Sequence, residues 1–162
     1  FQSLCNFIFY TYSTHFYRLS ISTKKQIIRK YSLLGLFISG AFFLLITVAF
    51  RYWYQNGLTP SICLLLSCFV QISFIQQPYI YLLYQQKKTS NISAAGIWSI
   101  LVLIVSLLIF NSACPSTVFT NFIWSALVAH ISRAIFFYYN GKKYLYSNYH
   151  LSDKVPEQNA SF

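Results

Sequence analysis

The sequence predicts an all-α integral membrane protein with four transmembrane helices, and three observations carry this prediction. The 162-residue chain is 56% hydrophobic and 9% charged, whereas soluble domains carry about 25% charged residues. Several apolar runs approach the length of about 20 residues with which a helix crosses a bilayer. The basic residues gather beside these runs and leave the runs themselves nearly free of charge.

Residues 1–31 form an aromatic and basic arm. Phe and Tyr crowd its first half, and its second half holds the bases Arg18, Lys24, Lys25, Arg29 and Lys30. The apolar part is too short to cross a membrane. We expect an interfacial segment that leads into a basic helix beside the membrane, with a docking arm for a partner subunit as the alternative.

The first predicted span covers residues 32–53 and ends in the aromatic and basic residues typical of a membrane interface. Ser32, Gly35 and Ser39 share one face of this helix. Small side chains on one face let a second helix approach closely. This face therefore predicts a contact between helices.

The second predicted span covers residues 61–84. Pro60 precedes it and suits the first position of a helix. Pro78 removes one backbone hydrogen bond and is expected to kink the helix. Gln76 and Gln77 come directly before Pro78, and we expect them to satisfy the carbonyl groups that the kink frees.

The rest of the chain continues the same pattern. Small and polar residues again share one face in each span: Gly96, Ser99 and Ser106 in the third, and Asn121, Ser125 and Ser132 in the fourth. Asn140-Gly141 is expected to end the last helix. After the second span we predict a polar turn (residues 85–93), the third span (94–110), an uncharged loop (111–117), the fourth span (118–139) and a polar tail (144–162). The transmembrane domain as a whole covers residues 32–143.

The basic residues predict the orientation in the membrane, because cytoplasmic, matrix or stromal loops are enriched in Lys and Arg. With four alternating spans, Arg51 alone falls on one side. Both termini fall on the positive side, together with Arg18, Lys24, Lys25, Arg29, Lys30, Lys87, Lys88, Lys142 and Lys143. The bases sit beside apolar spans, so Lys87 and Lys88 are expected to meet anionic lipid headgroups rather than nucleic acid.

Asp153 and Glu157 are the chain's only acids. This excludes carboxylate acid–base chemistry, a Ser-His-Asp triad within the spans and a carboxylate metal site. The four cysteines show neither a CxxC pair nor zinc-ligand spacing. We therefore expect no catalytic residues, no metal and no cofactor. His130 with Arg133 is a remote candidate for haem or quinone binding, and Arg133 is more readily explained by a lipid phosphate or an adjacent subunit.

Polar residues at membrane depth allow two interpretations. In one, they hold helices together through interhelical hydrogen bonds of about 0.6–2 kcal/mol each. In the other, they line a solute pathway composed of Gln71, Gln77, Pro78, Asn121 and Ser125.

Short motifs between residues 60 and 143 resemble the PQ-loop pattern of SemiSWEET-type transporters and mitochondrial pyruvate carrier subunits. They are Pro78 with Lys87, Thr89, Ile92 and Ser93, then Gly96-Ile97-Trp98-Ser99, Asn121-Phe122 and Tyr139-Asn140. Tyr79 stands where the motif has glutamine. The resemblance implies a three-helix carrier with one added span, in which Pro78 is the hinge and Asn121 faces the solute.

Two function classes follow. The first is a non-catalytic accessory subunit that works with other membrane subunits in a mitochondrial respiratory or other energy-transducing complex. The bias toward Phe, Tyr, Ile, Asn and Lys, which resembles coding from an AT-rich genome, favours that location. The second is a small-solute carrier with a pathway hinged at Pro78.

Overall fold

The computed structural model describes residues 9, 16, 19–53, 60–113 and 118–147. These ranges contain no strands, and their helices are α2 (Ile21–Trp53), α3 (Pro60–Gln85), α4 (Thr89–Ala113) and α5 (Val118–Ser147). All four helices are long and apolar enough to cross a membrane, and each predicted span lies within one of them. The chain is an all-α four-helix membrane protein, as its composition predicts.

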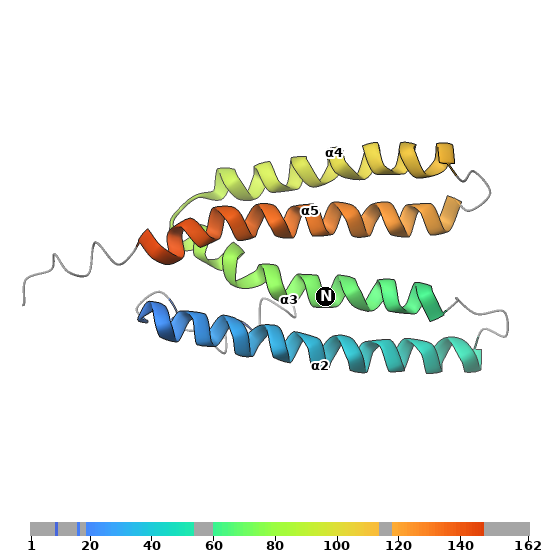
Figure 1. Ribbon diagram of the computed structural model, residues 1–162, viewed down its shortest axis with the longest axis horizontal. Helices are drawn as coiled ribbons and strands as arrows, with labels where there is room; N and C mark the ends of the chain where they lie inside the picture. Colours follow the sequence, from blue (N-terminus) through green and yellow to red (C-terminus); the bar gives the residue numbers. More distant parts are fainter. Residues whose placement is uncertain (1–8, 10–15, 17–18, 54–59, 114–117, 148–162) are drawn as a thin grey trace, which may run out of the picture.

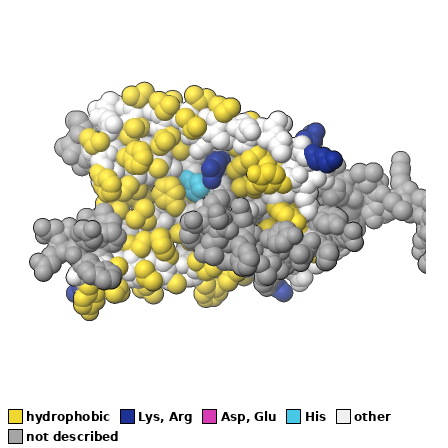
Figure 2. Space-filling view, turned by 180° about the vertical axis from the view of Figure 1, so that it is seen from behind, with side chains coloured by type: hydrophobic (Ala, Val, Ile, Leu, Met, Phe, Trp, Pro, Cys, Tyr) yellow, Lys and Arg dark blue, Asp and Glu magenta, His cyan; other side chains and the backbone are white. Residues whose placement is uncertain are grey.

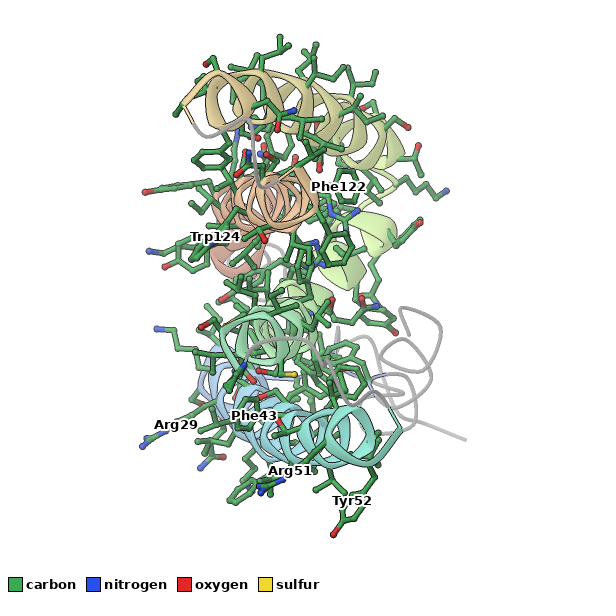
Figure 3. All side chains as sticks on the ribbon, turned by 90° about the vertical axis from the view of Figure 1, so that its right-hand side faces the viewer. Arg29, Phe43, Arg51, Tyr52, Phe122 and Trp124 are labelled. Atoms are coloured by element: carbon green, nitrogen blue, oxygen red, sulfur yellow. The ribbon has the colours of Figure 1, made fainter. Side chains whose placement is uncertain are left out.

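The four helices lie side by side in a single layer, in the order α2, α3, α5, α4 (Figures 1 and 3). In Figure 1, α2 and α4 run in one direction while α3 and α5 run in the other. The two central helices are therefore parallel. The chain achieves this because α5 returns between α3 and α4 instead of packing on the outside of α4.

The edge helices of this layer bury few of their own side chains. In the most apolar window of α4 only 6% of residues are buried within the protein, against 50% in α3. Phe122 and Trp124 of α5 point toward opposite broad faces of the layer (Figure 3), and both are largely exposed. Exposed apolar surface costs about 25 cal/mol per Å² in water, so both faces require lipid or another apolar protein surface.

The helix directions place the basic residues at the two ends of the layer as predicted from alternation. α2 begins and α5 ends at the same end of the layer (Figure 1). Lys25, Lys87 and Lys142 lie in segments at that end, whereas Arg51 lies near the opposite end of α2. The beginning of α2 and the end of α5 therefore lie on the same, basic side of the layer.

The turn between α3 and α4 is shorter than the predicted polar turn of residues 85–93. The backbone nitrogens of Lys87 and Lys88 donate to the carbonyls of Tyr84 and Leu83, each at 3.0 Å. Lys87 has a φ of 53°. These bonds and this left-handed residue form a Schellman motif, which satisfies the last carbonyls of α3. Thr89 can then begin α4 directly.

The expectation that Asn140-Gly141 ends the last helix is wrong, because α5 continues to Ser147. Gly141 does not have a positive φ. A Cβ atom on Gly141 would lie 2.7 Å from Tyr79 Cβ and 3.0 Å from Tyr79 Cα. The glycine therefore serves the close approach of α5 to α3 and does not cap the helix.

The predicted loop of residues 111–117 also begins too early, since Asn111 belongs to α4, which ends at Ala113. Its remainder, residues 114–117, lies outside the described residues. The local reason is visible at Ser112, whose hydroxyl donates to the Ile109 carbonyl at 2.8 Å within the helix. The Ser112 hydroxyl is thus satisfied within the helix, so a polar residue can occupy its last turn.

Phe9 and Phe16 of the first half of the arm are described, and both are buried. The Phe9 ring makes edge-to-face contacts with Tyr31 of α2 at 4.9 Å and Tyr81 of α3 at 5.3 Å between centroids. The ring centroids of Phe16 and Tyr81 lie 6.2 Å apart. At these two positions the arm packs on its own chain. The other residues of the arm, apart from 19–31, and the tail from residue 148 lie outside the described residues.

The α2–α3 seam, where these two helices touch, uses the small-residue face predicted from Ser32, Gly35 and Ser39. A Cβ atom on Gly35 would lie 2.7 Å from Phe74 Cγ. The side chain of Gln71 crosses the same seam. Its Nε2 donates to the Ser32 carbonyl at 3.3 Å, and its Oε1 lies 3.5 Å from Ser39 Oγ. The predicted contact face is confirmed by these contacts.

We predict that Gly35→Ala destabilises the chain, because overpacking a well-packed contact costs about 1–3 kcal/mol. The matched control is Gly40→Ala, since a Cβ there has nothing within 4 Å and alanine gains up to about 1 kcal/mol in helix propensity. Thermal unfolding of the detergent-purified variants should separate the two. Equal melting temperatures would refute the close packing at Gly35.

Candidate functional site

The α3–α5 seam, where the two parallel central helices meet, brings polar side chains together in the middle of the layer. Ser73 of α3 and His130 of α5 approach within 3.1 Å, from Oγ to Nε2. The His130 ring also packs on Phe69, with 5.4 Å between ring centroids. A histidine deep in an apolar helix is thus held by one polar and one aromatic contact from the neighbouring helix.

The geometry of the two helices places a second pair of polar residues one turn further along the seam. Ser73 and His130 are separated by 57 residues, and the same separation relates Gln76 to Arg133. Because α3 and α5 are parallel, residues with one constant separation lie at one level of the seam. Positions three apart also share a helical face. Gln76 and Arg133 therefore lie level with each other, one turn beyond Ser73 and His130. We call these four residues the central polar cluster.

Two members of the central polar cluster have buried polar atoms without a hydrogen-bond partner. Gln76 is completely buried, and neither its Oε1 nor its Nε2 bonds to any of the described residues. The Nε of Arg133 is also buried without a partner. An unsatisfied buried polar group costs about 1–3 kcal/mol, and more when it is charged. The cluster is therefore the least satisfied polar region in the part of the chain that the structure describes.

The charge of the cluster is equally unbalanced. Before Asp153 the sequence contains no carboxylate to neutralise Arg133. Figure 2 shows histidine and basic side-chain atoms next to each other among hydrophobic side chains. The histidine is His130, because no other histidine lies within the described residues. An arginine at the centre of a membrane helix costs about 2.5–3.5 kcal/mol on insertion scales. The arrangement thus suits an anionic or hydrogen-bond-accepting group that approaches from this face.

The predicted pathway residues are divided between seams. Gln71 lies in the α2–α3 seam, as described above. In the α4–α5 seam, Asn121 Nδ2 donates to the Phe110 carbonyl at 3.2 Å and to Asn111 Oδ1 at 3.1 Å. The Ser125 carbonyl lies 3.5 Å from Ser106 Oγ. Gln71 and the pair Asn121 and Ser125 thus lie in different seams, on the two outer sides of the α3–α5 pair. The pathway itself stays a prediction.

Further polar contacts occupy the α4–α5 seam. Trp98 Nε1 donates to Ser132 Oγ at 2.6 Å, and Ser99 Oγ donates to the Ala129 carbonyl at 3.4 Å. The stripes predicted on the third and fourth spans therefore face each other. This arrangement is the one that interhelical adhesion requires.

Gln77 and Pro78 lie next to the central polar cluster. Both are buried in α3, which contains Pro78 within its helical length. The C-terminal part of α3 turns toward α5 in Figure 1, as a proline bend allows. The expectation that Gln76 satisfies a freed carbonyl is wrong, because its amide has no partner. Gln77 does make a contact of its own.

His130 offers little to a cofactor in this arrangement. Its Nε2, one of the two ring atoms able to ligate haem iron, is engaged by Ser73. Among the described residues, no group of three His, Cys, Asp or Glu side chains is placed to hold a metal. Lys87 and Lys88, predicted to contact lipid or a partner, are exposed at the α3–α4 turn.

No protein-family model, curated protein or solved structure matches the chain. The likeness to PQ-loop carriers therefore stays a prediction from the short motifs.

Sequence reasoning noted Gln76 and Arg133 separately and did not pair them. The pairing depends on the offset between two helices that are not neighbours in sequence, which no local period encodes. Ser73 was missed as well, since one serine in an apolar helix usually bonds to its own backbone. It does so here too, with the Phe69 carbonyl at 2.9 Å.

We predict that Gln76→Leu stabilises the isolated chain in detergent by about 1–3 kcal/mol, because it removes an amide that has no partner. Gln77→Leu is the matched control and should destabilise, since Gln77 makes a contact. Thermal unfolding of both variants provides the measurement. A loss of stability in Gln76→Leu would show that its amide is satisfied in the purified chain.

Proposed function

We propose that this chain is a non-catalytic accessory subunit of a membrane-embedded complex. The observation that carries the proposal is the central polar cluster, with its unpartnered Gln76 amide and Arg133 Nε. In a complex, an adjacent subunit supplies a carboxylate or another acceptor to Arg133, whose side chain is only partly buried. Removing one partner from such a buried pair costs about 3–5 kcal/mol, so the contact is strong enough to hold a subunit in place.

The single-layer fold supports the same proposal. The layer exposes many large apolar side chains, so a flat chain of this size can lie against a larger membrane protein. The hydrogen bonds across both outer seams support adhesion as the role of the polar stripes. Lys87 and Lys88 remain proposed contacts to lipid or to a partner at the basic end of the layer.

The proposed membrane is the mitochondrial inner membrane, and the proposed assembly is a respiratory or other energy-transducing complex. The support is compositional: with 16 Phe and 14 Tyr in 162 residues, together with many Ile, Asn and Lys, the chain resembles the product of an AT-rich genome. The basic side of the protein would then face the matrix.

We predict that Arg133→Gln disperses the native complex, because the partner's acceptor loses its charged donor. The measurement is the migration of the tagged chain on native gels of detergent-solubilised membranes. Arg51→Gln is the control, because it removes the same charge from an exposed residue in the last turn of α2. The proposal fails if Arg133→Gln co-migrates with the complex as the unchanged chain does.

The second candidate is a small-solute carrier, favoured by the position of Pro78 beside the central polar cluster. In that case the purified chain forms a stable small oligomer and moves a solute into liposomes. Pyruvate is the probe that the sequence resemblance suggests. Asn121→Ala should then abolish uptake, with Ser112→Ala as a control at the same end of the layer. Uptake by the isolated chain would overturn the accessory role, and unchanged uptake in Asn121→Ala would remove Asn121 from the pathway.

A further inference from the structure

A cavity of about 250 Å³ lies between α2, α3 and α5, at the basic end of the layer. Lys25 and Arg29 of α2 and Lys142 of α5 line it. These bases come from segments more than one hundred residues apart in sequence, and the fold brings them to one cavity. The proposed function does not involve this site.

Two tyrosines form the wall of the cavity on the α3 and α5 side. Tyr79 and Tyr138 meet edge to face, with 5.2 Å between ring centroids. The ammonium of Lys142 lies 5.3 Å from the centroid of the Tyr138 ring. The close packing of Gly141 on Tyr79 sets the distance between the two helices here. The wall is thus built from packed aromatic rings and presents a positioned cation.

The electrostatics of this cavity favour an anion. Lys25 and Arg29 are four residues apart on one helix, where like charges repel, and Lys142 adds a third positive charge. The described residues that line the cavity include no carboxylate. Lys25 and Lys142 have other contacts as well, but an ammonium carries three donors and can serve a phosphate in addition.

The surroundings select a lipid over a free anion. Leu33 and Leu36 follow Arg29 at positions four and seven further along α2, so they continue its face toward the middle of the layer. Both are about half exposed, at 48% and 56%. An acyl chain lies along such a strip when its headgroup occupies the cavity. Tyrosines are also enriched at the level of the headgroups.

We propose that this cavity binds the phosphate of an anionic phospholipid headgroup. Arg29 offers a planar fork of donors that matches phosphate oxygens, Lys25 and Lys142 add point charges, and the adjoining strip of α2 receives an acyl chain. Basic cavities between membrane helices on the positive-inside face are suited to such headgroups.

The test compares a cavity variant with a control that removes exposed bases from the same side of the protein. Lys25→Gln, Arg29→Gln and Lys142→Gln empty the cavity of its lysines and arginine. Lys30→Gln with Lys143→Gln is the control, because these exposed lysines do not line the cavity. Phosphatidylglycerol is titrated into the detergent-purified full chain, with phosphatidylcholine and inorganic phosphate as reference probes. Native mass spectrometry counts bound lipid, and thermal unfolding reports stabilisation.

The unchanged chain and the control should bind phosphatidylglycerol in preference to phosphatidylcholine. Each basic residue contributes about fivefold near an anionic surface, so the cavity variant should bind on the order of a hundredfold more weakly. If that variant does not fold, Arg29→Gln alone should weaken binding about fivefold.

Three outcomes would overturn the proposal. An equal loss of binding per charge removed in the cavity variant and the control would indicate general charge attraction. Stabilisation by inorganic phosphate as large as that by the lipid would indicate a free anion. If Asp153→Asn with Glu157→Gln lowers stability in neutral detergent as much as the cavity variant does, the occupant is the chain's own acidic tail.

Discussion

A side-chain amide in the middle of an apolar helix depends on a neighbouring helix for its hydrogen bonds, whereas a serine hydroxyl can bond to its own backbone. The constraint on the amides organises the structure. In the α2–α3 seam Gln71 meets it by reaching the Ser32 carbonyl. In the α4–α5 seam Asn121 meets it at the end of α4. The α3–α5 seam meets it only in part, since Ser73 and His130 pair while the amide of Gln76 does not. The buried polar atoms without a partner that the structure describes thus all belong to this one seam.

The single layer follows from the same pattern. Each edge helix carries one polar or small-residue face and buries it against one central helix, while the central helices bury two faces. With no polar face left on the outside of α2 or α4, nothing draws the layer closed into a bundle, and both broad faces remain apolar.

Much of the fold could be predicted from the sequence, and the failures have physical causes. The contact faces at Gly35 and at Ser106 were predictable, since small residues at helical spacing mark close approach in any apolar helix. The prediction that Asn140-Gly141 ends the last helix was wrong because a glycine that suits a helix end also suits a close contact between helices. The contact with Tyr79, remote in sequence, determined which role Gly141 has. For the candidate site, residues at membrane depth could be named individually, but not which of them meet.

The sequence by itself determined the number of helices, their polar faces and the grouping of bases at one end, because hydrophobic length, helical period and charge are local properties. Only the tertiary structure decided that α5 returns between α3 and α4, parallel to α3. It likewise decided that Gln76 lies level with Arg133 and that Lys25, Arg29 and Lys142 share one cavity. Those relations depend on the offset between helices, which is settled by contacts such as Gly141 on Tyr79 and Gly35 on Phe74. A period along one helix carries no information about that offset.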